Sequence, residues 1–153
     1  MKISRSEQRE QAFTLVFEHI FNQSPIPELI DSAAEARDVE VGDYAKAAAE
    51  GTIAHLDEID AYIERFTVGW QKKRISKASL AILRLAIYEI CYESDVPTGV
   101  AINEAVNLAK KYAPVEDASF VNGLLGAMVR KLENEKAKQA VAQPAPDAES
   151  VGQ

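Results

Sequence analysis

Cysteine and histidine are scarce in this chain of 153 residues, which has one cysteine (Cys91) and two histidines (His19 and His55). A lone thiol cannot form an internal disulfide, and these side chains are too few to fill a structural zinc site. The sequence therefore excludes disulfide-stapled miniproteins and zinc fingers, and we expect no bound metal. No stretch approaches the about 18 uncharged apolar residues of a membrane span, and the first residues lack the apolar core of a signal peptide. We expect a cytoplasmic protein that does not contact a membrane.

Motifs that carry catalysis are also missing. The chain has no Gly-rich phosphate loop, no G-x-S-x-G and no H-E-x-x-H. Neither histidine has a glutamate three residues before it, as the Glu-x-x-His pairs of carboxylate dimetal centres require. We therefore predict that the protein is not an enzyme and holds no cofactor.

Helical periodicity is what the sequence does have. Up to about residue 136, apolar residues recur every three or four positions and glycine and proline are sparse, which predicts an all-α fold of six or seven helices. The clearest helices are expected at residues 4–23, 43–67, 76–93, 98–113 and 117–135. The range 43–67 is either one long helix or a broken pair. Residues 76–93 are apolar around most of the helix circumference, so we place them at the centre.

The periodic pattern ends at about residue 136. Residues 137–153 are rich in Ala, Gln, Pro and Glu and lack large apolar side chains apart from two isolated valines. Little buried area is available there to offset the entropy of ordering the chain. We therefore predict one helical domain at 1–136 and a disordered tail at 137–153.

Charge is distributed unevenly, although the net value is −7. Residues 25–68 hold 3 basic and 11 acidic side chains, whereas residues 69–93 hold 5 basic and 2 acidic ones. The acidic region is either a solvated face or a surface that receives a basic protein.

The expected first helix carries a row of cations. Lys2, Arg5 and Arg9 fall, together with Phe13, within an arc of about 80° on a helix. Cations near a helix start oppose the helix dipole, so their placement adds some support for an anionic ligand, although composition alone favours a solvated face. Glutamates between them cancel part of this charge, and a solvated face stays the alternative.

Two later segments also contain candidates. Arg84 lies in the most apolar expected helix, so it must either pair with a carboxylate such as Glu89 or Glu104 or reach the surface in a groove. In the segment 116–123, Asp117 or Ser119 would cap the last helix, and the first backbone amides would meet an anion. There an exposed Phe120 would suit base stacking, whereas Asn122 and Gly123 suit a tight contact between helices.

Several runs of residues together resemble one known family. They are RISK at 74–77, AILRLAIYE at 81–89, DVP at 95–97, VAINEAV at 100–106 with LAK at 108–110, and FVNGLL at 120–125, preceded by Arg9-Glu10, Ala12 and Phe17. Over about residues 5–133 the chain resembles the NusB family of bacterial transcription antitermination factors. The resemblance implies a NusB-like fold of two small helical bundles and an RNA-binding assembly factor without catalysis.

The resemblance also implies partners. In the family, NusB pairs with NusE, a protein of the small ribosomal subunit, and the pair holds the boxA element of nascent ribosomal RNA. With NusA and NusG it tethers this RNA to the elongating RNA polymerase and suppresses premature termination. The expected partners are therefore boxA-like single-stranded RNA, NusE and the RNA polymerase elongation complex. A homodimer is left open, because a helix face that buries against a second copy looks the same in sequence as one that buries within the chain.

Site residues follow from position in this resemblance and from the patterns above. The candidates for RNA binding are Lys2, Arg5, Arg9, Arg84, Glu116, Ser119 and Phe120. Those for binding NusE are Phe17 and Ser79. The chain departs from the family at three places. It has Arg5-Ser6-Glu7 where relatives often have consecutive arginines, and Ser119 where a basic residue often precedes the phenylalanine. Ser79-Leu80 replaces a frequent acidic-basic pair. These departures predict weaker intrinsic RNA affinity and more dependence on the partner.

Two other functions compete with this one. A protein-only adaptor would keep the fold with little RNA affinity of its own. An enzyme would require, as in the NusB-like domain joined to a ribosomal RNA methyltransferase, a nucleotide-binding βαβ segment, which this sequence lacks.

Overall fold

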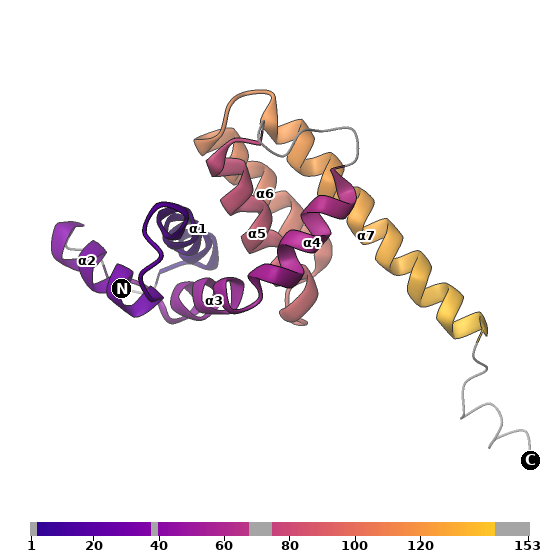
Figure 1. Cartoon of the computed structure of the whole chain (residues 1–153), viewed down its shortest axis with the longest axis horizontal. Helices are drawn as coiled ribbons and strands as arrows, with labels where there is room; N and C mark the ends of the chain where they lie inside the picture. Colours follow the sequence, from indigo (N-terminus) through magenta and orange to yellow (C-terminus); the bar gives the residue numbers. More distant parts are fainter. Residues whose placement is uncertain (1–2, 38–39, 68–74, 143–153) are drawn as a thin grey trace, which may run out of the picture.

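A computed structural model describes residues 3–37, 40–67 and 75–142 of the chain. This described part contains seven helices and no strand, which confirms the all-α prediction (Figure 1). The helices are α1 (Arg5–Phe21), α2 (Ile26–Arg37), α3 (Asp43–Ala54), α4 (Leu56–Phe66), α5 (Lys77–Tyr92), α6 (Thr98–Tyr112) and α7 (Asp117–Ala142). Helix α2 was not among the ranges placed from the pattern; it begins at the proline-containing break, where Pro27 loses no helical hydrogen bond because it lies in the first turn.

The helices form two small groups that share one core. Helices α1, α2 and α3 pack together, α4, α6 and α7 form the other group, and α5 lies between the groups and contacts both (Figure 1). Most of α5 is buried, as expected for the central element: nine of its sixteen residues have little or no exposed surface. The two-bundle architecture predicted from the family resemblance is therefore confirmed.

The predicted range 43–67 is a broken pair, and the break falls at His55. The backbone of His55 leaves the helical conformation at φ −111° and ψ 21°, and its amide donates back to the carbonyl of Gly51. The imidazole stacks on the ring of Tyr92 in α5, with centroids 3.9 Å apart. This stack ties the junction of α3 and α4 to the central helix.

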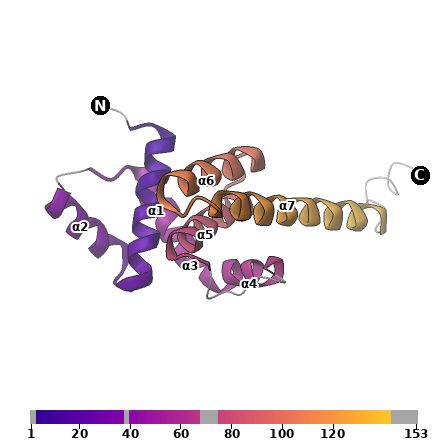
Figure 2. The ribbon, with the colours of Figure 1, turned by 90° about the horizontal axis from the view of Figure 1, so that it is seen from above.

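Helix α7 is longer than the sequence pattern predicted. It continues to Ala142, past the expected helix end at 135 and the expected domain end at 136, and its last part projects beyond the other helices (Figure 2). The projecting part consists of strong helix formers, and an ion pair between Arg65 and Glu135 ties it to α4. Apolar burial is therefore a poor guide to where this helix ends. The rest of the expected tail, 143–153, lies outside the described residues.

Neither a membrane-spanning helix nor a metal-binding cluster occurs among the described residues. No helix there is both long and apolar enough to cross a membrane. No group of three or more metal-ligating side chains was found in the same ranges.

Two helical glycines should respond in opposite ways to alanine. A Cβ at Gly51 would lie 2.4 Å from the ring of Tyr88, whose hydroxyl donates to Glu93, whereas a Cβ at Gly123 would meet no atom within 4 Å. We expect Gly51→Ala to lower the free energy of unfolding by about 1–3 kcal/mol through overpacking. Gly123→Ala should raise it by about 0.4–1 kcal/mol, because alanine is the better helix former. Thermal unfolding followed by circular dichroism measures both, and equal effects would contradict the packing described for Gly51.

Candidate nucleic-acid interface

The N-terminal end of α1 presents Arg5 on the ring of Tyr44. Ser4 caps the helix by accepting a hydrogen bond from the amide of Glu7. Arg5 is exposed, and its guanidinium carbon lies 3.8 Å from the centroid of the Tyr44 ring. The structure therefore places an accessible cation at the start of α1. Its anionic ligand stays a prediction.

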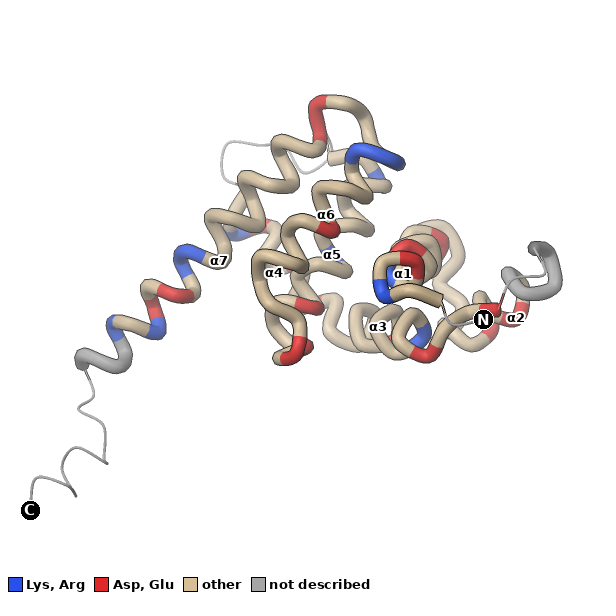
Figure 3. Tube along the Cα trace, turned by 180° about the vertical axis from the view of Figure 1, so that it is seen from behind, with Lys and Arg blue, Asp and Glu red and all other residues tan. Residues whose placement is uncertain are grey.

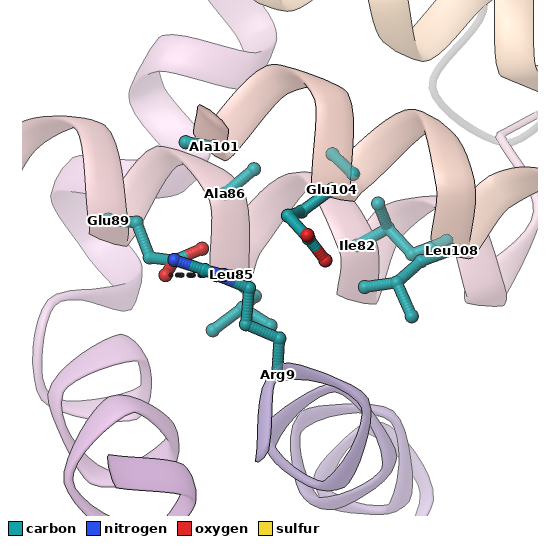
Figure 4. Close-up of a pocket in the computed structure, with 9 residues that line it drawn as sticks. Arg9, Ile82, Leu85, Ala86, Glu89, Ala101, Glu104 and Leu108 are labelled. Atoms are coloured by element: carbon teal, nitrogen blue, oxygen red, sulfur yellow. Dashed lines mark hydrogen bonds and ion pairs between the residues drawn. The ribbon is translucent and has the colours of Figure 1, made fainter. Parts of the chain in front are cut away.

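Arg9, one turn further along α1, is buried. Its side chain enters the seam between α1, α5 and α6, and its Nε donates to Oε2 of Glu89 at 2.8 Å (Figure 4). The Tyr44 hydroxyl donates to the same carboxylate oxygen. Arg9 is 5% exposed and Glu89 1%, and the seam holds no space for a ligand. Burial and the hydrogen bond to Glu89 raise the pKa of Tyr44 well above its usual value.

The C-terminal end of α6 brings further cations next to α1. Lys110 and Lys111 are exposed in its last turn, where cations also complement the helix dipole. Lys111 Nζ donates to Glu10 Oε1 at 2.7 Å, and the Tyr112 hydroxyl donates to the same oxygen. These two hydrogen bonds lower the pKa of Glu10. Earlier along both helices, Ser6 Oγ donates to Glu104 Oε1 at 2.9 Å, so α1 and α6 lie side by side.

The start of α7 directly follows this end of α6. Glu116 and Ser119 are exposed, while Phe120 is half-buried and packs against the core. Asn122 and Gly123 are exposed, so within the described ranges the tight helix contact considered for them is not formed. Phe120 is therefore a partly exposed residue beside polar ones, at the end of α6 that carries the lysines.

A row of aromatic rings follows α1 toward its C-terminal end. The ring centroids of Phe13 and Phe17 are 5.9 Å apart and those of Phe17 and Phe21 are 5.2 Å apart. Phe21 is 65% exposed, more than Tyr112 at 42% or Tyr92 at 37%, the other exposed aromatic side chains of the described ranges. Phe13 lies beside the lysine end of α6, where Tyr112 packs on it with ring centroids 5.0 Å apart. From there the row runs along α1 to the exposed Phe21.

Comparison with known proteins identifies the family to which this arrangement belongs. Residues 6–130 match the family model described as the NusB family. The chain belongs to the NusB family. It is 43% identical to the transcription antitermination protein NusB of Acetivibrio thermocellus over 130 residues, which is 84% of this chain and 90% of that protein. It is 42% identical to the protein of the same name from Agathobacter rectalis over 128 residues, covering 80% of this chain and 97% of the relative.

Solved structures show the same fold. The solution structure of NusB from Aquifex aeolicus has a TM-score of 0.74 at 28% identity, covering 86% of this chain and 90% of that one. A crystal structure of the antitermination factors NusB and NusE in complex with double-stranded RNA has a TM-score of 0.73 at 27% identity, with 83% of this chain and 96% of that one covered.

Three of the predicted site residues in this NusB chain have partners inside the fold. A phosphate contact needs an accessible guanidinium, so the burial of Arg9 argues against the predicted direct contact with RNA. Arg84 pairs with a carboxylate, which was one of the two alternatives expected for it. The partner is Asp60 of α4, not Glu89 or Glu104, and both hydrogen bonds are 2.9 Å long. Glu89 lies five residues further along α5 and therefore faces α1.

Ser79 is also turned inward. It is 0% exposed, and its Oγ donates to Oδ2 of Asp117 at 2.9 Å, as does Oγ of Ser76. Asp117 thus joins the starts of α5 and α7, and the predicted role of Ser79 at a NusE surface lacks an exposed side chain.

Other predicted residues lie where a ligand can reach them. Arg5, Glu116 and Ser119 are exposed, and Phe17 and Phe120 are half-buried. Lys2, like the basic run at 72–74, lies outside the described residues. Acidic residues are spread along α4, while both signs of charge alternate on the projecting end of α7 (Figure 3).

The sequence interpretation missed Lys110 and Phe21 as site candidates. Lys110 was noted only as part of a family motif, although a basic pair closing an exposed helix end was a usable signal. Phe21 continues the spacing of four residues set by Phe13 and Phe17.

Alanine at Arg9 and at Arg5 should separate a structural arginine from a surface one. Arg9→Ala leaves Glu89 buried without its cation, so we expect the free energy of unfolding to fall by about 3–5 kcal/mol. Arg5→Ala removes an exposed cation–π contact and should lower it by at most about 1 kcal/mol. Urea denaturation followed by circular dichroism checks this pair of matched substitutions, and comparable losses would contradict the assigned roles.

Proposed function

We propose that this chain is a transcription antitermination factor that binds boxA RNA in nascent ribosomal RNA transcripts together with NusE. It couples that RNA to the elongating RNA polymerase in the cytoplasm, with NusA and NusG, and acts by assembly without catalysing a reaction. The observation that carries the proposal is membership of the NusB family along 90% or more of the relatives' length, combined with a fold shared with a NusB–NusE–RNA complex.

The surface over α1, α6 and α7 supports an RNA-binding role. Arg5 and Lys110 are exposed cations that can meet phosphates, and Phe120 offers part of a ring on which a base can stack. Stacking of this kind contributes about 1–3 kcal/mol per base. The chain as a whole is acidic, so the attraction for RNA is local, and a basic partner on a neighbouring surface would strengthen it.

The exposed end of the aromatic row supports a protein partner. Phe17 and Phe21 form a partly exposed aromatic pair at the C-terminal end of α1. Aromatic side chains often dominate the binding energy of protein interfaces. We assign this aromatic pair to the surface that binds NusE, in agreement with the position of Phe17 in the family resemblance.

A second function, a protein-only adaptor, is favoured by the internal partners of two arginines. Because Arg9 is buried against Glu89 and Arg84 is paired with Asp60, fewer cations are left for RNA than the sequence suggested. In this alternative the chain binds NusE through α1 and leaves RNA contact to NusE.

The salt dependence of RNA binding distinguishes the two functions. If Arg5 and Lys110 each contact one phosphate, Arg5→Ala and Lys110→Ala should each flatten the log–log salt slope of the NusE complex by about 0.7 on single-stranded RNA. Gel shifts with a boxA RNA, single-stranded and as a duplex, at several salt concentrations measure this slope. Lys138→Ala, on the projecting part of α7, is the matched control, and unchanged slopes for both test variants would favour the adaptor.

Co-purification with NusE tests the partner assignment. We expect the wild-type chain to form a complex with the cognate NusE and Phe21→Ala to weaken it about tenfold or more, because a well-packed aromatic anchor is lost. Val100→Ala is the control, since Val100 is another exposed apolar residue and lies near the opposite end of α6 from Tyr112. Failure of the wild-type chain to bind NusE, with or without RNA, would overturn the proposed function.

A further inference from the structure

We propose that Tyr44 is a positioning residue for RNA binding, whose ring holds the Arg5 guanidinium in place to meet a phosphate. This inference rests on the proposed function and extends it to a residue of α3, a helix with no other role in the RNA surface described above. Tyr44 was not a candidate from the sequence.

Tyr44 contacts both arginines of α1, in different ways. Its ring lies 3.8 Å from the guanidinium carbon of Arg5 and 5.9 Å from that of Arg9. Its hydroxyl donates to Glu89, the carboxylate that also pairs with Arg9. The buried end of Tyr44 is thus locked to the core while the ring supports an exposed cation.

The backbone around Tyr44 is fixed by side chains of α1. Gln8 Oε1 accepts hydrogen bonds from the amides of Tyr44, at 2.9 Å, and Ala45, at 3.3 Å. Gln11 Oε1 accepts one from the amide of Gly42 at 3.0 Å. These glutamines take the place of an N-terminal cap on α3. A Cβ at Gly42 would lie 2.2 Å from Gln8 Oε1, so a larger residue there would displace Gln8 from these hydrogen bonds. Tyr44 therefore cannot move independently of the helix that carries Arg5.

The contact between Arg5 and Tyr44 is not needed to join α1 to α3. Gln8, Gln11 and the hydrogen bonds of Glu89 already do so, and a cation in the first turn of α1 opposes the helix dipole. A role of Arg5 in binding a phosphate explains the presence of an arginine at this position better. A guanidinium over a ring keeps its N–H donors at its edge, and fixing it beforehand lowers the entropy lost when a phosphate binds.

Two substitutions of Tyr44 isolate the role of the ring. Tyr44→Phe and Tyr44→Met both lose the hydroxyl that donates to Glu89, but only Tyr44→Phe keeps a ring beneath Arg5. Circular dichroism establishes that both variants are helical, and Tyr44→Leu replaces the methionine variant if that one does not fold. In NMR spectra without RNA, the side-chain protons of Arg5 should show an upfield ring-current shift in the wild type and in Tyr44→Phe, and this shift should be lost in Tyr44→Met.

Binding of a boxA RNA by the complex with NusE then tests the consequence. We expect Tyr44→Met to bind about two- to fivefold more weakly than Tyr44→Phe, the factor that an exposed cation–π contact supplies. In an Arg5→Ala background the two should bind equally, because the ring acts only through Arg5. The proposal is overturned if Tyr44→Met matches or exceeds Tyr44→Phe, or if their difference persists without Arg5. Absence of RNA binding by the wild-type complex would instead overturn the proposed function, while the NMR shift would still report the contact.

Discussion

A buried carboxylate on the central helix α5 joins that helix to the group formed by α1, α2 and α3. Glu89 of α5 accepts hydrogen bonds from Arg9 of α1 and from Tyr44 of α3, so one side chain of the central helix joins three helices. A buried charge is tolerated only when its partners satisfy it. Together with the contacts of α1 to α3 and α6, this interaction fixes the position of α1 against α5 and so of the exposed groups that α1 carries.

The same interaction gives the two arginines of α1 different environments. Helical spacing placed Arg5 and Arg9 on one face, and both matched basic positions of the family. Only the fold distinguishes them, because Arg9 reaches Glu89, which is 80 residues away in sequence, while Arg5 stops at the ring of Tyr44. The exposed cationic surface of α1 is consequently narrower than a projection of the sequence on a helical wheel indicates.

Much of the fold could be predicted from the sequence, because it depends on local signals. Apolar periodicity gave the central position of α5 and the approximate limits of α1, α5 and α6, and family motifs gave the two-bundle arrangement. The end of α7 was misplaced because Lys, Glu and Ala sustain a helix without a core. The inward positions of Ser79 and Arg84 depend on Asp117 and Asp60 from other helices, and composition contains no sign of such pairings.

The projecting part of α7 gives the molecule a built-in spacer. Glu135 still pairs with Arg65 of α4, and the helical residues from 136 to 142 beyond it advance about 10 Å at the rise of an α-helix. The described end of α7 is thereby carried away from the lysine end of α6. A fluorophore attached at Lys138, which is exposed on this projecting part, would therefore leave the faces assigned to transcript and ribosomal protein unobstructed.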